Sequence, residues 1–150
     1  MTWTVYLAGE IHSDWRDRIA EGVAAAGLDV KLVGPVTDHP ASDNCGVEIL
    51  GDEDKSFWKD RKGAGLNAVR TRTLIAGANV VVVRFGDQHR QWNAAFDAGW
   101  AAASGKPLIT LHEAGLSHAL KEVDAAACAV ATTPQQVVEI LRYVMDGKLK

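Results

Sequence analysis

Apolar residues follow strand and helix periods in alternation along the first part of the chain. The run WTVYLA at 3–8 is β-branched and aromatic and ends at Gly9, which is typical of a buried strand. Apolar positions then recur at helical spacing over 14–26, where Ser13 is a candidate N-cap and Gly27 a left-handed stop. A second short strand is expected at 28–33. This order predicts a βαβ unit with parallel strands.

The same alternation returns in the second half. Helical spacing over 66–76 precedes NVVVVRF at 79–85, which has the continuous apolar character of a central parallel strand. The pattern then predicts a helix at 92–104, a strand at 107–112, a short helix at 116–123, a short strand at 126–131, and a last helix from Thr133 to about Met145. We therefore expect a doubly wound, flavodoxin-like or Rossmann-like α/β sandwich of three layers with about five parallel strands.

The segment 34–62 interrupts this alternation. It is rich in Asp, Gly and Pro and shows little periodicity. We interpret it as a long inserted loop in a single domain spanning 1–150, although a segment of this length often hides a short helix. Such a loop is expected to act as a lid over a pocket or as a contact between subunits.

Composition narrows the class of protein. Hydrophobic residues make up 47% and charged residues 23%, near the averages of globular proteins, and the net charge of -3 provides no basic surface for nucleic acid. The two cysteines and five histidines lack metal or disulfide spacing. Neither a signal peptide nor an apolar run of membrane length is visible. We expect a cytoplasmic protein that uses no metal or cofactor and has no nucleic-acid or membrane partner.

The stretch GAGLNA at 63–68 formally matches the dinucleotide-binding fingerprint. The charged stretch FWKDRK precedes it where a strand would be required, so nicotinamide or flavin binding is disfavoured. No phosphate-binding P-loop or GxSxG nucleophile elbow occurs.

The fold itself selects a candidate site, because ligands of doubly wound sheets bind beyond the carboxyl ends of the strands. Four of the residues there, Arg16, Arg84, His89 and Arg90, suit a polar or phosphate group. The candidate substrate-binding residues are Gly9, Glu10, His12, Arg16, Asp38, His39, Arg84, His89, Arg90, Gln91, Trp92 and Asn93.

Asp97 is the only acid in the stretch FDAGWAAASGKPL at 96–108. In a helix its neighbours at three and four residues include Asn93 and Trp100, so its carboxylate can face a cavity beside an aromatic wall. Its place after a strand-end loop also puts it near a positive helix end, which favours the ionised form by ~0.3 to 1 kcal/mol. Two interpretations stay open: a nucleophile in a pocket, and an acid that only stabilises a helix end.

Three stretches in this order resemble the nucleoside 2-deoxyribosyltransferase superfamily: YLAG at 6–9, NVVVVRF at 79–85 and FDAGWAAASGKPL at 96–108. The whole chain, including TDHPASDNCG, FWKDRKGA and RFGDQHRQWNAAFDAG, also looks like the small bacterial YtoQ family. The first resemblance implies that Asp97 attacks the anomeric carbon of a 2-deoxynucleoside to form a covalent glycosyl-enzyme, while the Tyr6 hydroxyl positions it.

Two departures from the superfamily pattern affect this mechanism. Asp97 stands in place of a glutamate and is one methylene shorter, and a misplacement of about 1 Å can cost ~100-fold in rate. Gln91 stands where the superfamily has a carboxylate, and Asp87 could substitute for it if its loop folds inward.

We therefore expect an N-glycosidase or deoxyribosyltransferase acting on a nucleoside, nucleotide or related ribosyl compound. The alternatives are a non-catalytic nucleotide- or sugar-binding module on the same fold and a structural homo-oligomer. A homo-oligomeric state is expected with either function.

Overall fold

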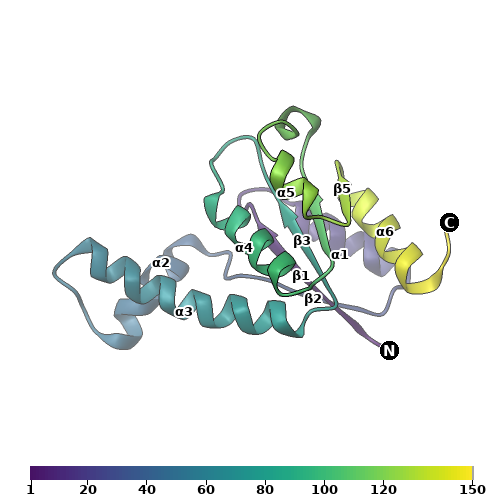
Figure 1. Cartoon of the computed structure of the whole chain (residues 1–150). Helices are drawn as coiled ribbons and strands as arrows, with labels where there is room; N and C mark the ends of the chain where they lie inside the picture. The colour runs from purple at the N-terminus through teal and green to yellow at the C-terminus, as the bar shows by residue number, and fades with distance from the viewer. Residues whose placement is uncertain (150) are drawn as a thin grey trace.

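A computed structural model describes residues 1–149 of the chain, and its centre is one parallel sheet (Figure 1). The five strands lie in the order β2-β1-β3-β4-β5. They are β1 (Trp3–Gly9), β2 (Val30–Val33), β3 (Val80–Arg84), β4 (Leu108–Leu111) and β5 (Ala129–Ala131). The order reverses between β1 and β3, as expected of a doubly wound sheet, and the predicted α/β fold is confirmed.

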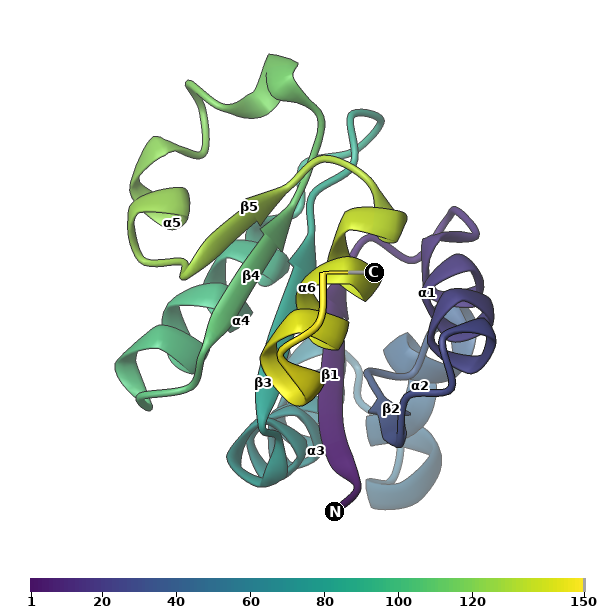
Figure 2. The same ribbon diagram turned by 90° about the vertical axis from the view of Figure 1, so that its right-hand side faces the viewer.

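Helices cover both faces of the sheet (Figure 2). One face carries α1 (Trp15–Ala25) and α6 (Pro134–Asp146), and the other carries α3 (Ser56–Gly77), α4 (Trp92–Ala103) and α5 (Lys121–Ala125). Strand alternation divides β1 between the two layers: Val5 and Leu7 pack toward α1 and α6, whereas Tyr6 and Ala8 pack toward α3 and α4. None of the helices within residues 1–149 is both long and apolar enough to cross a membrane.

The long loop predicted at 34–62 is wrong for most of its length, because the segment contains α2 (His39–Leu50) and the start of α3. Asp38 caps α2 by accepting a hydrogen bond from the backbone N–H of Ala41 at 2.8 Å. The sequence shows no clear apolar stripe there because α2 packs against α3 and not against the sheet. Figure 1 shows α2 and the first half of α3 projecting away from the sheet. We call residues 39–66 the α2–α3 arm.

A close helix contact holds the arm together. A Cβ atom added to Gly46 would lie 2.4 Å from the backbone nitrogen of Gly63, so the two helices touch through their backbones. The Asn67 side-chain amide donates to the backbone carbonyl and the hydroxyl of Ser42, at 3.1 Å in each case. Glycine is therefore required at position 46 for α2 to pack this closely on α3.

The remaining element boundaries differ modestly from the prediction. The helix predicted at 116–123 is a 3-10 turn at Ala114–Leu116 followed by the short α5. As predicted, Thr133 caps α6, and Gly105 follows α4 with a positive φ of 71°. The Lys106 ammonium donates to the carbonyls of Ala76 and Ala78, at 2.6 and 3.0 Å, and so connects the end of α3 to the end of α4.

Candidate active site

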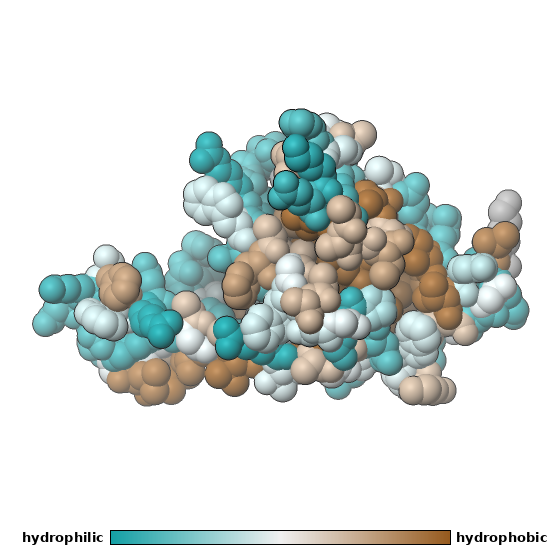
Figure 3. All heavy atoms as spheres, in the orientation of Figure 1, coloured by the Kyte–Doolittle hydropathy of each residue, from teal (hydrophilic) through white to brown (hydrophobic). Residues whose placement is uncertain are grey.

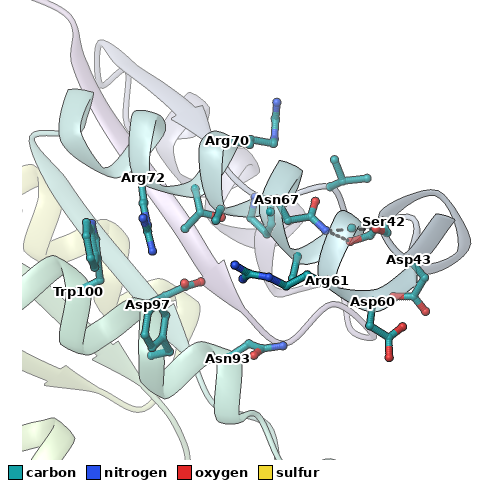
Figure 4. A pocket seen from close by; sticks show the side chains of 18 residues that line it. Ser42, Asp43, Asp60, Arg61, Asn67, Arg70, Arg72, Asn93, Asp97 and Trp100 are labelled. Carbon is teal, nitrogen blue, oxygen red and sulfur yellow. Dashed lines mark hydrogen bonds between the residues drawn. The ribbon is translucent and has the colours of Figure 1, made fainter. Parts of the chain in front are cut away.

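A cavity of about 590 Å³ lies between α3, α4 and the segment that follows β2 (Figure 4). The α4 wall consists of Asn93, Phe96, Asp97 and Trp100, and Pro35 and Val36 contribute from beyond β2. The opposite wall belongs to α3, which supplies more lining residues than any other element. The cavity thus combines two helices that the sequence order separates by a whole strand.

Asp97 is directed into this cavity by the packing of α4. Ala94, Ala98 and Ala101 recur at helical spacing on the buried face of α4 and pack on the sheet. Asp97 lies on the neighbouring face with Asn93 and Trp100 and is mostly buried. Small alanines let α4 approach the sheet closely, and this approach removes the Asp97 carboxylate from water.

Burial raises the pKa of Asp97 from 3.8 to about 6. The expectation that a helix terminus keeps this carboxylate ionised is wrong, because Asp97 lies beyond the first turn of α4, which begins at Trp92. Desolvation, and not the helix dipole, therefore sets the protonation of Asp97. The carboxylate is mostly ionised at neutral pH but poorly solvated.

Tyr6 lies beneath the wall of the cavity. Its side chain is fully buried in β1, and its hydroxyl donates to the Thr71 hydroxyl at 3.4 Å. Burial raises the pKa of Tyr6, the hydrogen bond with Thr71 acts in the opposite direction, and the negative charge of Asp97 raises it further. Tyr6 and Asp97 are therefore close enough to interact electrostatically, while Thr71 lies on the cavity surface between β1 and the solvent.

The face of α3 that borders the cavity carries small residues between two arginines. Arg61 and Arg72 flank the small residues Ala64, Gly65 and Ala68. The Arg72 guanidinium lies over the Trp100 ring at 4.5 Å from its centroid. The apolar pattern of the sequence gives no sign of this face, but small residues between two arginines at helical spacing are a signal of it in the sequence.

Several of the strand-end residues predicted from the sequence to bind substrate instead stabilise the turns at the ends of the strands. Glu10 is buried and accepts hydrogen bonds from the backbone of His12 and from the backbone and hydroxyl of Ser13, and Arg84 lies 3.6 Å from it. Burial alone would raise the pKa of Glu10, but these hydrogen bonds and Arg84 outweigh burial and lower it. Arg16 donates to the carbonyls of β1 and Glu10 at 2.6 to 3.2 Å. Glu10, Arg84 and Arg16 thus stabilise the first turn after β1.

Gly9 has a comparable structural role at the same edge. Its φ is 105°, and an added Cβ would lie 2.1 Å from the carbonyl oxygen of Arg84. The Gln91 side-chain carbonyl accepts from the backbone N–H of Gly86 at 2.7 Å, which orders the loop after β3. The Gln91 carbonyl therefore has a partner in this loop, while its buried amide nitrogen has none among residues 1–149.

The other candidates lie on exposed loops or helix ends. The rings of His12 and His89 are 4.7 Å apart, and Arg90 lies 5.9 Å from the ring centroid of Trp92. Further candidates away from the cavity are Asp87, which is exposed, Asp38, the cap of α2, and His39, which is 3.5 Å from Asp43. Among residues 1–149, only Asn93 and Asp97 of the sequence candidates line the cavity, with Tyr6 beneath it. Asp87 is exposed and does not line the cavity with Asp97.

The fold is that of the nucleoside 2-deoxyribosyltransferase-like α/β proteins. A 2-deoxyribosyltransferase from Bacillus psychrosaccharolyticus is similar over 90% of this chain and 90% of its own, with a TM-score of 0.52 at 15% identity. The CMP N-glycosidase of Clostridium botulinum is similar over 95% of this chain and 99% of its own, with a TM-score of 0.52 at 13% identity. At these identities the likeness is one of fold.

Sequence comparison gives the family. The family model described as nucleoside 2-deoxyribosyltransferase YtoQ matches residues 6–145, and the chain belongs to this family. The uncharacterized protein YtoQ of Bacillus subtilis (strain 168) is 41% identical over 146 residues, which cover 97% of this chain and 99% of that protein. The resemblance noted from the sequence is thereby confirmed.

Proposed function

We propose that the protein cleaves the N-glycosidic bond of a nucleoside or nucleotide, as an N-glycosidase or a deoxyribosyltransferase, with Asp97 as the nucleophile. One observation carries the proposal: a mostly buried carboxylate lines a cavity of ligand size, and burial raises its pKa to about 6. A carboxylate that is ionised at pH 7 and poorly hydrated loses little solvation when it attacks carbon. The names of the two structural neighbours support the same class of reaction.

The reaction would proceed in two displacements. An Asp97 carboxylate oxygen attacks the anomeric carbon, the bond from that carbon to the base nitrogen breaks, and the base leaves with the bonding electrons and takes a proton from water. A second base, or water, then attacks the same carbon, the ester bond to Asp97 breaks, and the attacking group loses a proton to solvent. Attack by a base makes the reaction a transfer, and attack by water makes it a hydrolysis.

In this proposal Tyr6 is a positioning residue. Its hydroxyl is fully buried and donates to Thr71, which lines the cavity, so Tyr6 acts on the site by holding the Thr71 side chain in place. The shorter aspartate is supported by the close approach of α4 to the sheet, which its buried alanines permit.

The test measures free base released from a panel of 2-deoxynucleosides and their 5′-monophosphates, with and without an added acceptor base. We expect release by the wild-type protein and none by Asp97→Ala or Asp97→Asn. Asp146→Asn, which removes an exposed carboxylate at the end of α6, is the matched control and keeps full activity. Mass spectrometry of quenched reactions should find a deoxyribosyl adduct on the peptide that contains Asp97. Undiminished release by Asp97→Ala would overturn the proposal.

A non-catalytic nucleotide- or sugar-binding module is the second candidate. It is favoured by the surroundings of Asp97, since no side chain within residues 1–149 donates a hydrogen bond to this carboxylate. Binding of a panel compound without base release, and with the same affinity in Asp97→Asn, would select the module over the enzyme.

We also propose that the protein is a homo-oligomer, supported by the apolar tip of the α2–α3 arm. Ile49, Leu50, Phe57 and Trp58 are 50 to 69% exposed there, and Figure 3 shows apolar atoms along the lower side of this arm. Exposed apolar surface gathered in one place is typical of a contact with another protein surface. Sedimentation velocity should show an oligomer for the wild type and a monomer for Phe57→Glu. A monomeric wild type at micromolar concentration would contradict this.

A further inference from the structure

We propose that the substrate of this site carries a phosphate group, as a nucleoside 5′-monophosphate does, and that Arg61 and Arg72 bind it. The inference rests on the proposed function for the position of the sugar at Asp97. The phosphate itself is inferred from the positive charges of Arg61 and Arg72, which line the cavity.

The two arginines lie on one face of α3. They are eleven residues apart, which is about three helical turns and ~16 Å of rise. Ala64, Gly65 and Ala68 between them leave a trough with little side-chain bulk. Figure 4 shows the side chains of Arg61 and Arg72 extending on the Asp97 side of the cavity, whereas Asp43 and Asp60 lie at the far end.

Arg61 and Arg72 have no carboxylate within 4.0 Å among residues 1–149. Asp97 is one of the carboxylates that lie farther than 4.0 Å from both guanidinium groups. The third arginine of the cavity, Arg70, donates to the carbonyl of Gly34 at 3.0 and 3.2 Å. Two positive groups in the cavity are thus left for a negative group of the ligand.

Stacking prepares Arg72 for this role. The Arg72 guanidinium lies over the Trp100 ring at 4.5 Å from its centroid, which restricts the position of the side chain. The N–H groups of an arginine held in this way can form two parallel hydrogen bonds to a phosphate. Neither of the sequence candidates for this task lines the cavity: Arg16 donates to backbone carbonyls, and Arg84 lies 3.6 Å from the Glu10 carboxylate.

The opposite wall fits the remainder of a nucleotide. Phe96 and Trp100 flank Asp97 along α4, and their rings are stacked with centroids 6.4 Å apart. Phe96 is 61% exposed, so the ring face turned away from Trp100 is left for a base. With the base at Phe96 and the anomeric carbon at Asp97, the α3 wall across the cavity is the surface left for the phosphate. A nucleoside without phosphate would provide no negative group for either guanidinium.

The experiment compares the binding of the four common 2-deoxynucleosides and their 5′-monophosphates by calorimetry, using Asp97→Asn to prevent turnover. We expect at least one monophosphate to bind tenfold or more tightly than its nucleoside, with a preference that weakens as salt increases. Arg72→Gln or Arg61→Gln in the same background should weaken monophosphate binding by about 10- to 100-fold and leave nucleoside binding unchanged. Arg18→Gln, on the exposed face of α1, is the control and should change neither.

Each outcome decides between the proposals. Equal binding of nucleosides and monophosphates, or no binding of any monophosphate, overturns the phosphate site. Base release from both kinds of compound with equal kcat/KM keeps the proposed function and overturns the phosphate site. Tighter binding of monophosphates without any base release by the wild type keeps the phosphate site and overturns the proposed function. If Arg72→Gln melts at a lower temperature than its parent, Arg72→Lys provides the test, since it keeps the charge but loses the paired hydrogen bonds. It should bind the monophosphate less tightly than arginine and more tightly than any neutral variant that folds.

Discussion

Replacing Asp97 by asparagine should stabilise the protein above pH 6 and have little effect at pH 4. The variant keeps the shape of the side chain and removes a charge that the fold desolvates. Burial raises the pKa of Asp97 from 3.8 to about 6, a difference of about 2 units, and each unit corresponds to about 1.4 kcal/mol. The full linkage value is about 3 kcal/mol, and partial exposure of Asp97 reduces the expected gain to about 1 to 3 kcal/mol.

The sign follows from proton binding. Between about pH 4 and pH 6 the folded protein holds a proton on Asp97 that the unfolded chain has released. Stability therefore falls as pH rises through this window, and above pH 6 the loss is complete. The unfavourable contribution of Asp97 is absent below the unfolded pKa and fully present above the folded pKa.

Urea denaturation at pH 4, 5, 6, 7 and 8 measures this effect as the difference in free energy of unfolding between Asp97→Asn and the wild type. Taking the difference cancels the other carboxylates that titrate in the same range. Asp146→Asn, which removes a solvent-exposed carboxylate, should show a difference that does not vary in this way with pH. A difference for Asp97→Asn that is flat from pH 4 to pH 8, or a less stable variant at pH 8, would refute burial as the cause of the pKa shift.

Three further results are expected. The kcat/KM for base release should rise about tenfold per pH unit below pH 6 and level off above it, because Asp97 must be ionised to attack; a profile that falls over this range would contradict the assigned role. Tyr6→Phe should lower kcat with little change in substrate affinity, since its hydroxyl contacts Thr71 and not the cavity, and steady-state kinetics that show only a higher KM would contradict this. In thermal melts, Gly46→Ala should destabilise the fold by about 1 to 3 kcal/mol, because its Cβ would lie 2.4 Å from the backbone of α3. The control Gly99→Ala, which has open space around it in α4, should stabilise the fold by about 0.5 to 1 kcal/mol. Equal effects of the two substitutions would refute the close contact between α2 and α3.

The sheet and its layers could be predicted from local pattern. NVVVVRF and WTVYLA are continuous apolar runs because both faces of a parallel strand are buried, and the helix spacing after each run leaves one topology class. Gly9 and Gly105 also stand where the chain needs a positive φ. These features depend on each residue's own preferences and its immediate neighbours.

The α2–α3 arm escaped prediction for a physical reason. Its helices bury glycine backbones against each other and leave apolar side chains such as Phe57 and Trp58 exposed, so neither helix shows the apolar stripe on which pattern analysis relies. The cavity is lined by residues of this arm and of the rest of α3, so the sequence pattern did not predict the cavity either.

The sequence by itself determined the doubly wound fold and the family resemblance, and it pointed to Asp97 and Tyr6 as candidate site residues. Tertiary structure decided which of the many strand-end polar groups face the cavity. Arg16 donates to backbone carbonyls at the end of β1, and Arg84 lies 3.6 Å from the Glu10 carboxylate. Arg61 and Arg72 on α3 have no carboxylate within 4.0 Å among residues 1–149. Tertiary structure also decided the protonation of Asp97, because desolvation by α3, α4 and the sheet is a property of the packed site and not of the helix that carries it.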